Sequence, residues 1–204
     1  MSNSSPHFNL EGTSLSVVDI ERASARETLR EGTDDLHRLL DTMPFMARLL
    51  ETDVSVGDYH AVLGVLMQWY GQCERMLVDV LAEAADHAHE QQQLLQLDLN
   101  ISAHNAFDTK TLRSTAAGWG AYYVMVGSSL GSVMISRHLK MRFSDGQTLA
   151  YYASAAARAR SFAGDFLPRL EQALADQSSR ADAIHGARIA FQMLIDLVRI
   201  SSKS

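Results

Sequence analysis

The sequence has very little cysteine. Cys73 is the single one among 204 residues, which excludes an internal disulfide and any metal site built from several cysteines. The lack of disulfides is typical of a reducing compartment. Because Cys73 lies in an apolar helical pattern, we expect it to be a small core residue and not a nucleophile.

Long hydrophobic runs and an excess of positive charge are also missing. No window approaches the roughly 20 apolar residues that span a bilayer. The start MSNSSPHFNLEGTS has neither the basic nor the apolar region of a signal peptide. The formal net charge of -6 gives no broad attraction for nucleic acid or anionic lipid. We therefore expect a cytoplasmic protein that binds neither nucleic acid nor a membrane.

Apolar residues in helical spacing are abundant. With 47% hydrophobic residues, the chain is long enough for one sizeable core. Residues 1–15, rich in Ser and Asn, are expected to be a flexible N-terminal arm, and residues 16–204 one domain. The first helix is predicted at Val17–Leu40 and ends before Pro44, and the second runs from a capping-box-like start at Ser55 and Asp58 to Leu81. After the polar residues Asp86–Gln93, a short helix is predicted at Leu94–Leu99 and a longer one through much of Thr111–Met141. A turn at Ser144–Gln147 is followed by helices at Leu149–Ala175, with a kink at Pro168, and at Arg180–Ile200. The predicted fold is an all-α, single-domain helical bundle.

His37 is the first candidate for chemistry. It lies in LREGTDDLHRLLD beside apolar positions and seven residues after Arg30. Two helical turns place Arg30 on the same face about 10 Å away, so a cofactor bound by His37 would have an acidic group near Arg30. A half-buried structural histidine with a solvated arginine fits the same spacing.

The second candidate is the glycine-rich stretch GWGAYYVMVGSSLGSVM. Glycine inside a buried helix costs around 1 kcal/mol relative to alanine, so this density indicates close backbone approach or a bend. Gly127 and Gly131 are four residues apart and are expected on one face of a helix. A flat ligand could lie against backbone there, or a second helix could cross closely.

Two other chemistries are suggested by local patterns and fail on context. Gly127 to Gly131 matches G-x-S-x-G with Ser129 as nucleophile, and Asp165 or Asp176 with His185 could complete a triad. The motif requires a strand before it in a parallel sheet, which the helical pattern does not provide. Three carboxylate–histidine pairs resemble di-iron ligands and are attributed to chance: Asp34/His37, Asp86/His89 and Asp182/His185. The other histidines are assigned structural or surface roles: His7, His60, His87, His104 and His138.

The order of these segments resembles the haem oxygenase family from about Arg26 to Arg199. LREGTDDLHRLLD resembles the helix that carries the iron ligand, DYHAVLGVLMQWYGQCE the second helix, LLQLDL the stretch that follows it, and GSSLGS the glycine-rich distal helix. Ser128, directly after Gly127, resembles the bacterial branch, which includes phytochrome-associated enzymes. The resemblance implies a helical bundle of the haem oxygenase type.

The resemblance also implies roles for individual residues. His37 would be the iron ligand, Arg30 a propionate contact, and Tyr122 a second propionate contact or pocket residue. Gly127, Ser128 and Gly131 would form the catalytic distal surface beside bound oxygen. Two departures from the family pattern stand out. Gly131–Ser132 replaces a pair of glycines, and the late helix reads SFAGDFLPRL, so its basic contacts are missing or come from Arg158 or Arg160.

The activity implied is the oxidative opening of haem b, both substrate and cofactor, to biliverdin, carbon monoxide and iron. Dioxygen and an external reductant are required. Because the chain has no flavin or nicotinamide fingerprint, the electrons are expected from a ferredoxin or reductase. A bacterial phytochrome is the implied receiver of biliverdin. The alternative is a haem-binding or haem-carrying protein on the same fold that has lost turnover.

Overall fold

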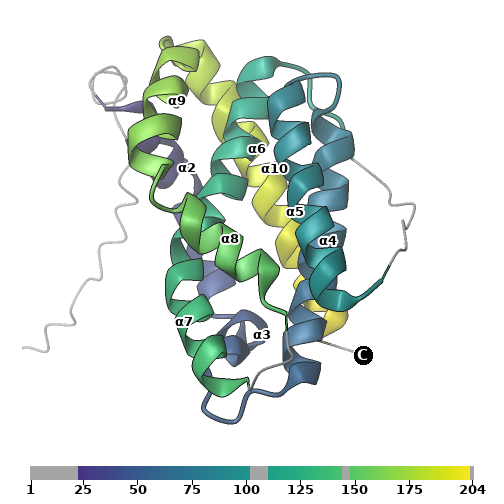
Figure 1. The fold of residues 1–204 in the computed structure, drawn as a ribbon. Coiled ribbons are helices and arrows are strands. Elements are labelled where there is room, and N and C mark those ends of the chain that lie inside the picture. Colours follow the sequence, from purple (N-terminus) through teal and green to yellow (C-terminus); the bar gives the residue numbers. More distant parts are fainter. Residues whose placement is uncertain (1–22, 102–109, 144–147, 203–204) are drawn as a thin grey trace, which may run out of the picture.

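The computed structural model describes residues 23–101, 110–143 and 148–202, and within these ranges the regular structure is entirely helical, with no strand (Figure 1). The expected N-terminal arm, His7, His104 and the Ser144–Gln147 turn lie outside them. None of the described helices is long and apolar enough to cross a membrane. The elements are α2 (Ala25–Asp41), α3 (Pro44–Ala47), η1 (Arg48–Leu50), α4 (Val56–Leu77), α5 (Ala82–Leu99), α6 (Thr115–Gly127), η2 (Ser128–Gly131), α7 (Ser132–Arg142), α8 (Ala150–Arg158), η3 (Phe162–Phe166), α9 (Leu167–Ala173) and α10 (Gln177–Ser201).

The two long N-terminal helices begin at capping boxes. Ser24 and Glu27 exchange side-chain and backbone hydrogen bonds at the start of α2, and Ser55 and Asp58 do the same at α4. Each box satisfies backbone N–H groups that the first turn leaves without partners. The start predicted at Ser55 is therefore confirmed.

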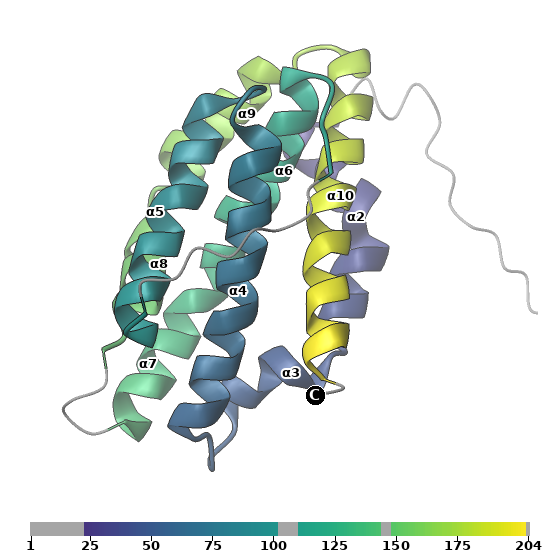
Figure 2. The same ribbon diagram turned by 90° about the vertical axis from the view of Figure 1, so that its right-hand side faces the viewer.

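The core lies between α4, α6 and α10. Figure 2 shows α5, α4, α10 and α2 running side by side, and α10 packs against α6, α2 and α4. Trp69 and Tyr70 of α4 are buried here, and the indole N–H of Trp69 donates to the Ala190 carbonyl of α10 at 2.9 Å. One cluster of buried apolar residues runs through the bundle.

Two glycines allow α6 and α10 to touch through their backbones. A Cβ added to Gly120 would lie 1.8 Å from the Ala183 carbonyl oxygen, and one added to Gly186 would lie 1.9 Å from that of Ala117. Real Cβ atoms do not approach so closely, so both positions require glycine. The close approach expected in the glycine-rich stretch is thus present at Gly120.

Three sequence predictions differ from the structure in their boundaries. The polar stretch at Asp86–Gln93 is not a separate connection but the middle of α5, because Ala84, Ala88 and Leu95 bury a narrow stripe of that helix. The segment Thr111–Met141 is interrupted by the 3₁₀ turn η2. In Leu149–Ala175 the break is the π-helical turn η3, and Pro168 lies in the first turn of α9, where its missing N–H costs little.

The start of α8 is fixed by a buried carboxylate on α5. Asp98 accepts hydrogen bonds from the Tyr59 hydroxyl at 2.7 Å and from the backbone N–H groups of Ala150 and Tyr151 at 2.8 and 2.9 Å. Asp98 is 3% exposed, so its charge depends on these three donors. This contact joins α4, α5 and α8.

Candidate functional site

Helix α2 forms one wall of a cleft and is held in place by α9 and α10. The Glu171 carboxylate accepts from the backbone N–H of Ala25 at 2.7 Å. Further along, Arg188 makes a two-pronged contact with Asp35 at 2.6 and 2.8 Å. The Arg188 hydrogen bonds hold the pKa of the Asp35 carboxyl below its ordinary value. Polar contacts at the surface therefore set the position of this wall.

His37 lies on the cleft side of α2 and is paired with a carboxylate. Its Nδ1 lies 2.9 Å from Asp41 Oδ2, and its side chain is 62% exposed. The edge of its ring contacts Phe191 of α10, with the ring centres 5.9 Å apart. A carboxylate that accepts from Nδ1–H fixes the ring and leaves the lone pair on Nε2, which is the arrangement of many metal-binding histidines.

The opposite wall is formed by α6 and η2, and its register follows from helix geometry. Tyr123 and Gly127 are four residues apart in α6 and both line the cleft. In the following 3₁₀ turn, residues three apart lie above one another, so Leu130 continues the row from Gly127. Gly131 is turned away from this row, because the four-residue spacing of an α-helix does not hold across η2.

Glycine at positions 127 and 131 is not required by backbone or packing. Gly127 has φ -59° and ψ -33°, and Gly131 has φ -72° and ψ -20°, which any residue adopts. A Cβ added at either position would meet no atom within 4 Å. The helix-crossing interpretation therefore applies to Gly120 and not to these two positions, where the backbone borders open space.

Ser128 connects the cleft to buried tyrosines. Its hydroxyl donates to the Met125 carbonyl at 2.6 Å and lies 3.4 Å from the Tyr70 hydroxyl, which is 3.2 Å from that of Tyr151. Burial raises the pKa of both tyrosines, so they stay neutral near pH 7. The three hydroxyls form a polar line from the cleft into an otherwise apolar core.

The cleft brings together only some of the predicted residues. Its volume is about 170 Å³, and it is lined by Arg26, His37, Leu40, Trp69, Tyr123, Val124, Gly127, Ser128, Leu130, Phe162, Phe191 and Leu194. His37, Gly127 and Ser128 were predicted. Arg30 lies instead in a shallow groove with Glu31, Asp34 and Arg38. Gly131 is not part of the lining.

Tyr122 also lies outside the His37 cleft. It lines a separate pocket with Arg158 and Arg169, and its ring lies 5.4 Å from the ring of His87. Burial, assisted by the positive charge of Arg158, lowers the pKa of His87 to about 4. Tyr123, one residue later, is the α6 tyrosine that faces the cleft.

Sequence reasoning missed Arg26, Tyr123 and the aromatic residues Phe162 and Phe191. Burial raises the pKa of Tyr123, and the charges of Arg26 and Arg30 oppose this. Tyr123 could have been found from its spacing of four residues to Gly127. Phe162 and Phe191 come from distant segments and carry no sequence signal beyond hydrophobicity.

The rival chemistries find no support in the described residues. Ala121–Val126, the strand that a nucleophile elbow would need, is part of α6, and the Ser129 hydroxyl donates to the Val126 carbonyl at 2.6 Å. Asp34 pairs with Arg38 at 2.7 Å and not with His37. No group of three or more His, Cys, Asp or Glu residues that could hold a metal ion occurs in the part of the chain that the structure describes.

Comparison with known proteins finds similarity in sequence and in fold. Residues 23–118 match the protein family described as Heme oxygenase. A heme oxygenase of Xanthomonas campestris pv. campestris (strain 8004) is 38% identical over 78 residues, which are 38% of this chain and 47% of that protein. The chain thus spans about half the length of the curated relative that it matches.

The fold is similar over a larger part of the chain. A crystal structure of the NO- and CO-bound heme oxygenase from Neisseria meningitidis superimposes with a TM-score of 0.64, covering 87% of this chain and 92% of that one at 18% identity. The protein therefore has the all-helical bundle of the haem oxygenase class. By sequence, its residues 23–118 are similar to the haem oxygenase family.

Proposed function

We propose that the protein is a haem oxygenase that binds haem b through His37 and opens it oxidatively to biliverdin, carbon monoxide and ferrous iron. Dioxygen and electrons from an external reductant complete the reaction. The fold, the family match and the cleft between α2 and α6 support this proposal. When bound, haem would supply the iron that binds dioxygen and the ring carbon that is oxidised.

The observation that carries the proposal is the pairing of His37 with bare backbone across the cleft. His37 offers Nε2 on one wall, and Gly127 on the other leaves open space that a side chain could fill without strain. A planar ligand held by the histidine needs that space, whereas the folded chain alone does not. The apolar lining suits a macrocycle, and Arg26 at the mouth suits its carboxylates.

The residues of the cleft then have separate tasks. Asp41 orients the His37 ring, and Arg26 and Arg30 attract the carboxylates of the substrate. Gly127 keeps the distal side free of side chains, with Gly131 beyond it, and the Ser128 hydroxyl donates to Met125 while its oxygen faces Tyr70. Tyr122 lines the neighbouring pocket with Phe162, which also lines the cleft, so its role in haem binding is to support the cleft wall.

The cleft must widen when it binds haem. Its volume of about 170 Å³ is below the roughly 300–1,000 Å³ of sites that bury drug-sized ligands. The His37 side chain is 62% exposed, so its ring can shift toward solvent as the cleft widens. We further propose that the protein works in the cytoplasm as one domain of residues 16–204, takes electrons from a ferredoxin or reductase, and supplies biliverdin to a bacterial phytochrome.

The test is a haem titration followed by turnover in air. Wild-type protein should show a Soret band typical of histidine-bound haem, and ascorbate should then replace it by a biliverdin band. His37→Ala should lose the axial bond and the conversion. His89→Ala, whose ring contacts Glu74 on the surface at 3.0 Å, is the matched control and should behave as wild type.

Two outcomes would contradict the proposal. An unchanged spectrum and unchanged turnover in His37→Ala would remove His37 as the ligand. Tight haem binding without any conversion by the wild-type protein, under ascorbate and under a ferredoxin system, would show a haem carrier instead.

A further inference from the structure

A second pocket lies on another side of α6, next to α5 and the segment from the end of α8 to α9. Its volume is about 150 Å³, and His37 is not part of its lining. Tyr122 and Val126 of α6 and Phe162 and Phe166 of η3 form its apolar part. The Phe166 ring meets the Tyr122 ring edge-on with centres 5.1 Å apart, and stacks on Phe162 at 5.7 Å. These aromatic walls suit a flat apolar group.

The polar part of this pocket is positively charged. Arg158 and Arg169 line it together with one carboxylate, that of Asp165. Arg169 is paired with Glu83 at the surface, and its guanidinium lies over the Trp119 ring, 5.4 Å from the ring centre. Arg158 is therefore the cation that remains for a ligand. We call this cavity the Arg158 pocket.

Arg158 is held by neutral groups. Its Nη1 donates to the Ser154 hydroxyl at 2.9 Å, and its Nη2 donates to the side-chain oxygen of Gln91, which is buried. Among the described residues, no ion pair includes Arg158. A guanidinium carries five N–H groups, so these two bonds fix its position and leave further donors.

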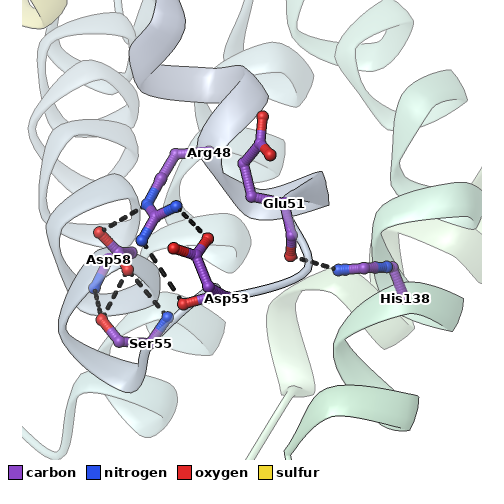
Figure 3. A network of polar contacts seen from close by, with 6 residues as sticks. All are labelled: Arg48, Glu51, Asp53, Ser55, Asp58 and His138. Atoms are coloured by element: carbon purple, nitrogen blue, oxygen red, sulfur yellow. Dashed lines mark hydrogen bonds and ion pairs between the residues drawn. The ribbon is translucent and has the colours of Figure 1, made fainter.

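Arg48 shows how the same fold neutralises a held arginine. Its guanidinium contacts the carboxylates of both Asp53 and Asp58, as Figure 3 shows. Arg158 is just as firmly positioned, by two side chains of other turns, but it is given no carboxylate. A half-buried cation that is oriented and not neutralised is a typical anion-binding group.

His87 adds a second unmatched polar group to the pocket lining. Its Nε2 is buried and hydrogen-bonds to no other described residue, and its ring lies 5.4 Å from that of Tyr122. Burial and the charge of Arg158 lower its pKa to about 4, so the ring is neutral near pH 7. A buried polar atom without a partner is unfavourable. In the tautomer with its proton on Nε2, this atom can donate to an anion.

We infer that the Arg158 pocket is a second ligand site, which binds a small aromatic carboxylate with its ring between the aromatic walls and its carboxylate on Arg158. Two parallel N–H···O bonds from a guanidinium match a carboxylate in shape and charge. The volume of about 150 Å³ is below the roughly 300 Å³ at which drug-sized sites begin, so the ligand is of one-ring size. The site goes beyond the proposed function and does not depend on it.

Two other occupants fit the pocket less well. A haem carboxylate reaching over from the cleft would have to pass Phe162, which lines both cavities and is 5% exposed. A phosphate ion would leave the aromatic walls without a contact, and Asp165 would repel its second charge. An aromatic carboxylate uses the charge and the rings together.

Calorimetry with benzoate tests the site in the haem-free protein. Benzoate should bind with a Kd of about 1 mM or below, and benzamide, which has the same shape without the charge, about tenfold more weakly. Arg158→Gln should weaken benzoate binding about tenfold, because it removes the charged fork. Arg160→Gln is the matched control, since this exposed arginine lines neither cavity, and it should bind benzoate as wild type does.

A blocking variant keeps the inference testable if Arg158→Gln fails to fold. Ser161 is exposed and lines the pocket, so Ser161→Phe should fill it without disturbing the core and should abolish benzoate binding. Trp119 supplies an optical signal, because its ring lies 5.8 Å from Tyr122 and 6.0 Å from Phe166. Benzoate should change its fluorescence in the wild-type protein and not in Ser161→Phe.

The possible results decide between the occupants. Absence of benzoate binding by the wild-type protein, or equal binding by wild type, Arg158→Gln and Ser161→Phe, would overturn the inference. If inorganic phosphate displaces benzoate at equal concentration, the pocket recognises charge alone and the assignment to aromatic carboxylates is wrong. If saturation with haem abolishes benzoate binding, the pocket belongs to the haem site and the inference also fails. A wild-type protein that binds benzoate but does not convert haem would refute the proposed function alone.

Discussion

Gly120 and Gly127 of the glycine-rich segment should respond to alanine in opposite ways. In Gly120→Ala the new methyl group would meet the Ala183 backbone, which cannot move aside as a flexible side chain would. Overpacking of this kind costs up to about 3 kcal/mol, and the better helix propensity of alanine returns about 1 kcal/mol. The haem-free protein should therefore lose about 2 kcal/mol, or roughly 4–8 °C in Tm for a chain of this size.

Gly127→Ala should have the opposite effect on stability. Its backbone is already helical and no atom lies within 4 Å of the added Cβ. Stability should stay level or rise by up to about 1 kcal/mol, which is roughly 2–4 °C in Tm. The cost should appear in haem affinity and conversion, because the methyl group occupies the wall opposite His37.

Thermal unfolding followed by circular dichroism, with and without haem, measures both effects. Gly127→Leu and Gly131→Leu extend the series, because only the first residue lines the cleft. Both should fold with near-normal stability and form biliverdin poorly, Gly127→Leu more so. Gly131→Leu should keep ferric haem through His37, whereas Gly127→Leu should bind it more weakly. Destabilisation of Gly127→Ala comparable to that of Gly120→Ala would show that packing explains both glycines. Full conversion by Gly131→Leu would remove Gly131 from the site.

Three further predictions follow from single contacts. Arg26→Glu should weaken haem binding more than Arg30→Glu, because Arg26 lines the cleft and Arg30 does not. Wild-type affinity of both variants in a haem titration would place both residues outside the carboxylate site. Asp98→Ala should destabilise the protein by about 3 kcal/mol in urea unfolding, since three donors lose a buried charged acceptor; a change below about 1 kcal/mol would contradict this. Folding lowers the pKa of His87 from an ordinary 6.5 to about 4, so between these pH values the unfolded chain binds a proton that the folded chain does not. The free energy of unfolding should therefore drop by about 2 kcal/mol between about pH 7 and about pH 5. A His87→Phe variant with the same pH slope would refute this contribution.

The helical class and the main helices could be predicted because their signals are local. The capping residue Ser55 and the periodic apolar residues that follow it are visible in the sequence, and α4 begins where they indicate. The break at η3 could not be predicted in the same way. Pro168 is a visible helix breaker, but it is tolerated in the first turn of α9, and the π-helical turn before it has no strong sequence signal.

The candidate site was predictable where one segment carries it. His37 and Gly127 each lie in a distinctive local stretch, and the structure places them in one cleft. The orientation of the tyrosines depended on helix register, and a difference of one residue places Tyr122 in another pocket. Phe191 reaches His37 from α10, a contact that only the packing of the helices creates.

The backbone contact of Gly120 and Gly186 has a mechanical consequence for the cleft. It fastens α6 to α10 without intervening side chains, so the wall that carries Gly127 and the helix that carries Phe191 move as one piece. Helix α2 is held to α10 through side chains instead, because Ile184 packs over Gly32 and Arg188 bonds to Asp35. The two walls of the cleft are therefore joined to α10 in different ways, α6 through backbone atoms and α2 through side chains, which can change rotamer when a ligand enters.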